Sequence, residues 1–345
     1  MRKNIQGIHI GSKNYPRLKA GWLHSDLAKK LDSDYFIKKK FDFNEVINQR
    51  KSVFSAITNL NKEARKLEKI SEVGLSKKPL AADLDVDLLS KKFYVYKESL
   101  PHGGVFKLKN IDLVDIPKVD RKVQKILDDE LKAEKQVFEL YKKNQGEEYI
   151  TQLLSTHNLG LSKKFVPTKW SITAVDDMIA KNLKKELSEF DGHIFFSGKY
   201  LDNLVIGVMF PGSWSFEFVE IYGGKVESDF ESHFGRKGYA KNTVGGYYAA
   251  RLAVSEFCTK KKVSGRFVVF RFILKGYRFS LGVWVVREAV RSALKKYFVA
   301  SDLEEVKNRG KVYIPEPYYY NFVELLSKSK TLSHSLYQTT LGAHK

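Results

Sequence analysis

The sequence has almost no cysteine and little proline. Its single cysteine, Cys258, excludes an intrachain disulfide and any zinc site built from several cysteines. There are only 8 prolines against 43% hydrophobic and 13% aromatic residues, which is the composition of a folded protein and excludes a disordered or collagen-like chain. A chain of 345 residues is long enough for one large or two ordinary domains.

Long apolar runs are also missing. No stretch approaches the ~18 residues that a membrane-spanning helix needs. The opening residues, 1–6, lead into no hydrophobic segment of the kind found in secretory signals. We therefore expect a cytoplasmic protein without a membrane partner.

Positive charge, in contrast, is in excess. The chain carries 60 Lys and Arg against 40 Asp and Glu, a formal net charge of +20. Between residues 241 and 300 there are 13 Lys or Arg and only two acids, Glu256 and Glu288. A basic, aromatic-rich stretch favours a phosphate-backbone partner and hence a nucleoid-associated protein. A general enrichment in lysine, as in proteins from hot habitats, is the alternative.

Hydrophobic periodicity predicts the α+β (mixed α/β) class. A mixed N-terminal region over 1–165 precedes a C-terminal domain over 166–330, which has an antiparallel or mixed sheet flanked by helices, and a tail over 331–345. The spacing predicts helices over 43–75, 121–143, 173–189, 243–260 and 282–297. It predicts strands at 8–10, around Leu84, and at 93–96, 105–114, 194–200, 204–210, 214–222 and 266–274.

Two adjacent carboxylates, Asp176 and Asp177, stand near the expected start of a helix. Carboxylate oxygens in this arrangement can hold a divalent metal ion. The alternative is structural, because Thr173 and Asp176 have the spacing of a capping box and acids in a first turn complement the helix dipole.

A third carboxylate, Glu217, falls in the expected strand 214–222 on the same face as Val219 and Ile221. A carboxylate among apolar neighbours must be paired, protonated or bound to a metal. An ion pair with a buried arginine is the alternative to a metal site.

The segment 235–251 combines basic residues and glycines at a predicted helix start. Free backbone amides there can bind an anion, and glycine permits its close approach. Arg251 has the helical spacing of an inward-facing residue, which either grips a phosphate or pairs with a buried acid such as Glu217. The predicted phosphate- or nucleotide-binding residues are Arg236, Lys237, Asn242, Thr243, Gly245, Gly246 and Arg251.

Further along, Arg278 precedes a helix on which Arg287, Arg291 and Lys295 recur at steps of four. Such a row can follow a nucleic-acid backbone, so we predict DNA contacts at Arg278, Arg287 and Arg291. A solvated basic face is the alternative.

Three of these segments, 166–177, 242–253 and 281–288, resemble the archaeal Nre family of DNA-repair proteins. Weaker similarity at 10–16 and 74–79 extends the resemblance over nearly the whole chain. The resemblance implies a role in DNA repair.

Two departures limit what the resemblance implies. Many relatives carry an N-terminal cysteine cluster that resembles a zinc ribbon, and this chain has none, so we expect no zinc. Relatives also tend to end in a motif that binds the sliding clamp. Here Gln338 and Leu341 fit that motif, but His344 and Lys345 replace its aromatic anchors, so we expect clamp binding to be weak or absent.

The leading hypothesis is a DNA-repair protein that binds DNA and acts as a metal-dependent nuclease. Mg²⁺ or Mn²⁺ would be held by Asp176, Asp177, Glu217 and Glu288, of which the first three are the catalytic candidates. A non-catalytic DNA-binding adaptor, with the same acids paired to arginines, is the first alternative. A switch that binds ADP or ATP is the second.

Overall fold

The computed structural model describes residues 1–13, 15–60, 64–92, 103–183, 187–236 and 243–333. The chain divides into two compact units, Met1–Ile179 and Ala180–Lys345. This division falls inside helix α7 (Thr168–Leu183), later in the chain than the predicted boundary. Both units combine helices with sheet, so the α+β class is confirmed.

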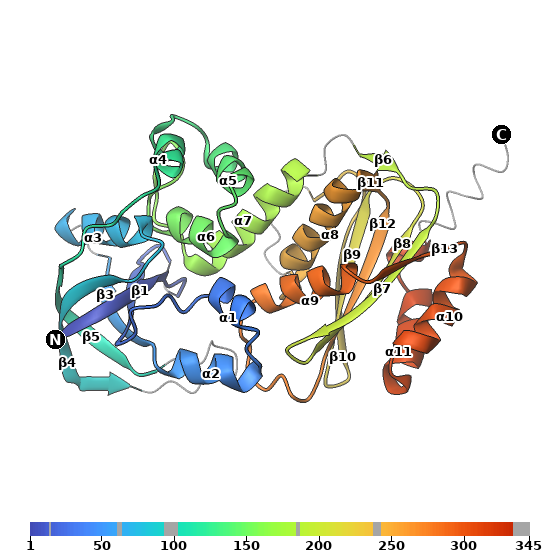
Figure 1. Ribbon diagram of the computed structural model, residues 1–345, viewed down its shortest axis with the longest axis horizontal. Helices are drawn as coiled ribbons and strands as arrows, with labels where there is room; N and C mark the ends of the chain where they lie inside the picture. Colours follow the sequence, from blue (N-terminus) through green and yellow to red (C-terminus); the bar gives the residue numbers. More distant parts are fainter. Residues whose placement is uncertain (14, 61–63, 93–102, 184–186, 237–242, 334–345) are drawn as a thin grey trace. The chain divides into compact units, whose positions relative to one another are not determined.

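Five strands of the first unit close into a barrel in the order β1-β2-β3-β5-β4 (Figure 1). All neighbouring strands are antiparallel except β3 and β5, which run parallel. The long first strand pairs on one side with β4, over residues 2–5, and on the other with β2, over residues 4–10. The strands are β1 (Arg2–Ile10), β2 (Lys19–Ser25), β3 (Phe54–Asn59), β4 (Leu80–Lys92) and β5 (Val105–Leu113).

Alternating apolar side chains explain why these segments form a barrel. Each strand directs every second residue inward, where it is removed from water. The indole of Trp22 is completely buried in this interior. Its apolar neighbours there include Ile8, Ile10, Ala20, Ala56, Ala82, Leu84, Leu108 and Ile111.

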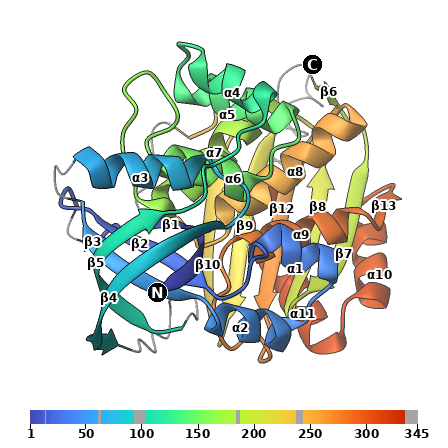
Figure 2. The same cartoon turned by 60° about the vertical axis from the view of Figure 1, so that its left-hand side comes forward.

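Helix α3 connects β3 to β4 and packs on β1 and α6, and α6 also contacts β1 (Figure 2). Side-chain caps start several helices of this unit; Asp42 and Glu45, for example, form a capping box at the start of α2. Besides α7, the helices of this unit are α1 (Ser33–Lys39), α2 (Phe43–Lys51), α3 (Ala64–Leu75), α4 (Arg121–Asp128), α5 (Ala133–Lys142) and α6 (Glu147–Ser155).

Two predicted helices are shorter than the periodicity indicated. The predicted helix 43–75 was wrong in its middle, where β3 separates α2 from α3, because the β-branched and aromatic residues there pair with β2. The predicted helix 121–143 is interrupted at 129–132, between α4 and α5. The strand predicted at 93–96 lies outside the described residues.

The second unit contains a six-stranded mixed sheet in the order β10-β9-β12-β8-β7-β13. The predicted hairpin is confirmed as β7 and β8, whereas the two edge strands were not predicted. Only β9 and β12 are parallel neighbours. The strands are β7 (His193–Tyr200), β8 (Asn203–Phe210), β9 (Ser215–Tyr222), β10 (Lys225–Glu231), β12 (Arg266–Ile273) and β13 (Tyr297–Ala300), and a separate pair comprises β6 (Ser188–Glu189) and β11 (Val263–Ser264).

Helices cover both faces of this sheet (Figure 1). α8 (Tyr247–Lys261) and α9 (Trp284–Leu294) share one core with residues such as Phe216 and Phe218 of β9. α10 (Leu303–Tyr313) and α11 (Glu316–Ser327) share the other core with alternate residues of the same strands, among them Val219. Because both faces are buried, the central strands are almost continuously apolar, as in β8.

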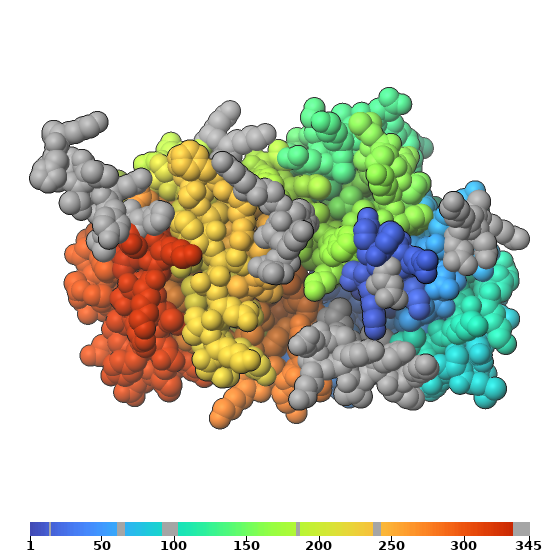
Figure 3. Space-filling view, turned by 180° about the vertical axis from the view of Figure 1, so that it is seen from behind, coloured from blue at the N-terminus to red at the C-terminus, as the bar shows by residue number. Residues whose placement is uncertain are grey.

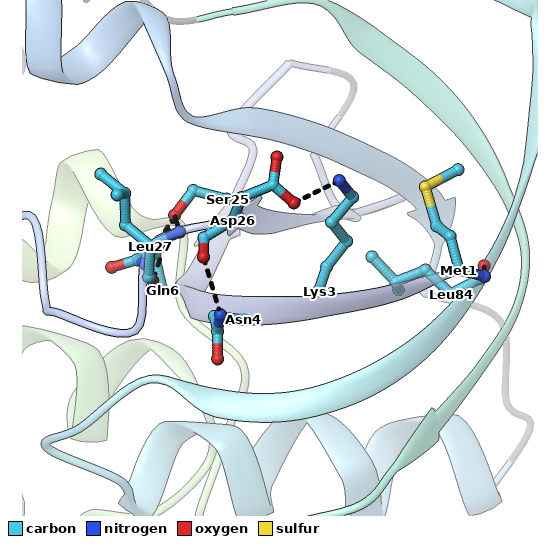
Figure 4. Close-up of polar contacts among 8 residues, drawn as sticks. All are labelled: Met1, Lys3, Asn4, Gln6, Ser25, Asp26, Leu27 and Leu84. Carbon is cyan, nitrogen blue, oxygen red and sulfur yellow. Dashed lines mark hydrogen bonds and ion pairs between the residues drawn. The ribbon is translucent and has the colours of Figure 1, made fainter.

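His24, near the end of β2, is a buried titratable group of the barrel. Its ring lies 6.0 Å from that of Phe54 and 6.4 Å from that of Phe106, and neither ring nitrogen has a hydrogen-bond partner among the described residues. Burial and the charge of Lys3 lower the pKa of His24 to about 4, although Asp26 opposes the shift. Lys3 and Asp26 pair at 2.5 Å (Figure 4).

We expect this histidine to make the protein less stable in mild acid. In the unfolded chain the histidine has a pKa of about 6.5, so it takes up a proton as the pH falls below that value. In the folded chain it is protonated only near pH 4, so the free energy of unfolding falls as the pH falls. At pH 5 the loss should be about 2 kcal/mol relative to pH 7. His24→Phe should remove this part of the pH dependence in denaturant unfolding at the two pH values. If the free energy of unfolding falls equally from pH 7 to pH 5 in wild type and variant, the prediction is contradicted.

Candidate functional site

Asp176 and Asp177 lie in the middle of α7, not in its first turn. The helix begins at Thr168, so Thr173 is already inside it, and the Thr173 hydroxyl donates to the carbonyl of Lys169 at 3.3 Å. The capping-box alternative was therefore wrong, because the helix starts earlier than the apolar spacing indicated. Asp176 is buried and Asp177 is half-buried.

Glu217 is buried on β9, and its carboxylate accepts backbone hydrogen bonds. The amide of Thr331 donates to one oxygen at 2.9 Å and the amide of Lys330 to the other at 3.3 Å. These amides begin the helical turn that follows α11, where a negative charge complements the helix dipole. The contacts give Glu217 a structural role, with backbone amides in place of the arginine that was expected as a partner.

The other predicted metal ligand, Glu288, is on α9 and forms an ion pair with Arg291 at 2.6 Å. Glu217 shares its strand face with Val219, under α10 and α11, whereas α9 covers the opposite face of the sheet. The structure therefore does not bring Glu217 and Glu288 together. Across the residues that it describes, no group of three or more His, Cys, Asp or Glu is arranged to hold a metal ion.

Arg251 points inward, as its spacing predicted, and its partner is Glu231 at the end of β10. The guanidinium Nε lies 2.8 Å from the Glu231 carboxylate, and both side chains are buried. The same carboxylate oxygen accepts a hydrogen bond of 2.8 Å from the indole of Trp214. The structure thus favours the ion-pair alternative for Arg251, with Glu231 in place of Glu217.

Arg236 takes part in a second, related contact set. It pairs with Asp229 at 2.6 Å, and its guanidinium lies over the ring of Tyr247, 4.7 Å from the centroid. The other oxygen of Asp229 accepts the amide of Val244 at 2.6 Å. These contacts hold together the two ends of the segment between β10 and α8, whose predicted site residues Lys237 and Asn242 lie outside the described residues.

The two glycines before α8 have different surroundings. A Cβ on Gly246 would lie 3.1 Å from Phe218 and from Val286, so this glycine permits close packing of α8. A Cβ on Gly245 would meet nothing within 4 Å. The amides of Gly246 and Tyr247 both donate to the carbonyl of Val244, at 2.8 and 3.1 Å. Two of the amides expected to face an anion are therefore already bonded, and half-buried Thr243 adjoins this turn.

The three arginines predicted to bind DNA do not form one exposed row. Arg278 is exposed, but Arg287 is buried within α9. Arg291 makes a bidentate pair with Glu256 of α8, at 2.8 and 2.6 Å, in addition to its pair with Glu288. α9 packs against α8 and against strands β7 and β8, so most of its residues are buried.

Exposed lysines gather where α8 and α9 both end. Lys261 lies over the ring of Tyr297, 5.0 Å from its centroid, and Tyr297 follows the end of α9 at Leu294 by three residues. Within the described ranges, no ion pair holds these lysines. These charges are evident in the sequence, but their proximity depends on how α8 and α9 pack. We call them the lysine patch, which comprises Lys260, Lys261, Lys262, Lys295 and Lys296.

We expect the Arg251–Glu231 pair to be essential for stability. Glu231→Gln retains an acceptor for Trp214 but removes the negative charge that pairs with buried Arg251, which should lower the free energy of unfolding by about 3–5 kcal/mol. The matched control is Glu227→Gln, an exposed position on the same strand, for which little change is expected. Urea unfolding of both variants tests this, and equal stabilities would refute it.

Models of one protein family match almost the entire chain. The archaeal Nre N-terminal model matches residues 5–226, and the archaeal Nre C-terminal model matches residues 231–344. No solved structure shows significant similarity. None of the described helices is both long and apolar enough to cross a membrane.

Curated relatives agree with these models. The chain is 31% identical to "DNA repair protein NreA" of Archaeoglobus fulgidus over 84% of this chain and 78% of that protein. It is 30% identical to "DNA repair protein NreB" of the same organism over 71% and 66%, respectively. It is 28% identical to "DNA repair protein NreA" of Haloferax volcanii over 84% and 76%. With both family models and relatives of this similarity, the chain belongs to the archaeal Nre family.

Proposed function

We propose that this chain is a DNA-repair protein that binds DNA through the lysine patch. Its relatives carry the name DNA repair protein, and the patch is the observation that favours DNA binding by this chain. Lysines bind a phosphate backbone as point charges, independently of base sequence. The proposed contact is therefore with the backbone of DNA.

Burial separates the lysine patch from the other basic residues of the region. Arg251, Arg266, Arg271 and Arg287 are all buried, so they add little to the surface potential. The five lysines of the patch remain in water beside an aromatic ring, Tyr297. Cations at helix C-termini also complement the helix dipole. That effect accounts for a cation in a last turn but not for five on adjoining helix ends.

Metal-dependent cleavage stays a prediction, and it now depends on fewer residues. Glu217 and Glu288 have structural partners, so Asp176 and Asp177 are the remaining acidic candidates for Mg²⁺ or Mn²⁺. Nucleotide binding also stays a prediction. The exposed turn at Gly245 is its remaining support, because Arg251 is engaged by Glu231.

The lysine patch predicts a specific salt dependence of DNA binding. Lys261→Ala with Lys296→Ala should weaken binding to duplexes of any sequence. The slope of log affinity against log salt should fall by about one for each lysine removed, because fewer counterions are released. The control is Lys122→Ala with Lys125→Ala, which removes the same charge from exposed positions of α4. Fluorescence anisotropy across a salt series measures both. If the slope changes equally in the patch and control variants, the effect comes from overall charge and the lysine patch is not the DNA-binding site.

Cleavage is tested with the half-buried carboxylate Asp177. If it contributes to a metal site, Asp177→Ala should abolish Mg²⁺- or Mn²⁺-dependent cutting of branched or single-stranded DNA and leave DNA affinity unchanged. A gel-based nuclease assay with each metal and with EDTA is the measurement. If the variant cuts DNA as well as the wild type, Asp177 is not part of a metal site. If the wild type does not cut DNA, the non-catalytic DNA-binding adaptor is favoured.

A further inference from the structure

Two family motifs that lie far apart in the sequence meet at one end of the barrel. The loop over residues 11–18 connects β1 to β2, and α7 begins at Thr168. The Thr168 hydroxyl accepts a hydrogen bond of 2.8 Å from the amide of Ile10, the last residue of β1. In the space-filling view, dark-blue N-terminal residues adjoin light-green residues (Figure 3). This contact places the beginning of α7 beside the loop.

Two aromatic rings lie against each other at this junction and face water. The ring centroids of Tyr15 and Trp170 are 4.9 Å apart, with an interplanar angle of 56°. Tyr15 is 59% exposed and Trp170 is 39% exposed. Scattered exposed aromatics are ordinary on protein surfaces, but an adjoining pair presents a larger apolar surface on which a base can stack.

Positive charge surrounds this pair. Lys13 and Arg17 are each two residues from Tyr15 in the sequence. Lys19 is the first residue of β2, and Lys169 directly precedes Trp170. All four cations are exposed, and none forms an ion pair in the part of the chain that the structure describes. Neither segment contains an acid, since residues 1–25 and 149–175 have no Asp or Glu.

The barrel supplies an independent argument. It has five strands in the order β1-β2-β3-β5-β4, β3 is parallel to β5, and α3 lies between β3 and β4. This is the topology of oligonucleotide-binding barrels, which bind through the face of their second and third strands and through the loop between the first two. The Tyr15 loop is the corresponding loop here.

We propose that the Tyr15–Trp170 pair is a stacking platform for the bases of single-stranded DNA, with Lys13, Arg17, Lys19 and Lys169 holding its phosphates. Exposed rings stack on unpaired bases, whereas the bases of a duplex are already stacked on each other. The inference rests on the proposed DNA-binding function and adds a preference for single strands at a surface separate in sequence from the lysine patch.

Binding of a fluorescent oligothymidine of about 12 nucleotides and of a duplex tests the platform, since related barrels occupy about 4–16 nucleotides. Trp170→Ala and Tyr15→Ala should each weaken single-strand binding by roughly 10-fold and leave duplex binding unchanged. Tyr320→Ala is the matched control, because Tyr320 is 63% exposed on α11. It should change neither affinity.

Tryptophan fluorescence gives a second readout. Stacking on a base should quench Trp170, while Trp22, Trp214 and Trp284 are buried or half-buried. Trp170→Phe keeps an aromatic ring, so it should retain most of the single-strand affinity and lose the quenching. A packing role alone would instead lower the melting temperature of Trp170→Ala and leave single-strand affinity unchanged, which would overturn the platform.

The platform and the lysine patch fail in different ways. If both alanine variants bind single strands normally while the patch variant loses duplex affinity, the platform is refuted and the proposed function stands. If single strands are bound with quenching of Trp170 while patch variants behave as wild type, the platform stands and the patch is refuted. If the wild type binds neither form of DNA at low salt, both are refuted.

Discussion

The buried ion pair between Arg251 and Glu231 joins the central helix α8 of the second unit to its edge strand β10. Neither charge can be removed from water alone without a large desolvation cost, so each requires the other. Glu231 also accepts the indole of Trp214, which precedes β9. Strand, helix and the turn before β9 therefore meet at one carboxylate. This contact joins three elements beside the apolar core that α8 shares with the sheet.

The same requirement accounts for the other charges near the sheet. Arg271 pairs with Glu220 at 2.5 Å and donates to Asn203, while Arg291 is held by Glu256 of α8. Glu217 obtains its partners from backbone amides. A stretch that is strongly basic in sequence is thus less basic on the surface, because several of its arginines are used internally. The lysines remain outside, since a flexible ammonium that is strongly hydrated is costly to bury.

In the first unit, the constraint is closure of a five-stranded sheet. Apolar side chains fill the barrel, and its loops are left to carry polar and aromatic residues. The loop before β2 and the beginning of α7 become neighbours because Thr168 bonds to the end of β1. This is how a tyrosine and a tryptophan from distant motifs come to share one surface.

The sequence by itself determined the α+β class, the family, and elements with strong local periodicity, such as the hairpin of β7 and β8. It also indicated that Arg251 would face inward. It did not reveal β3 or β13, because their pairing partners are far away in the chain. It also missed β10, which pairs with neighbouring β9 across a two-residue turn but is mostly exposed and polar, so it lacks a strong apolar alternation. The identity of each charge partner was decided only by the tertiary structure. Glu231 and not Glu217 meets Arg251, and Glu217 and Glu288 lie on opposite faces of the sheet. Periodicity assigns a residue to a face of its own element, whereas partners are set by how the elements pack.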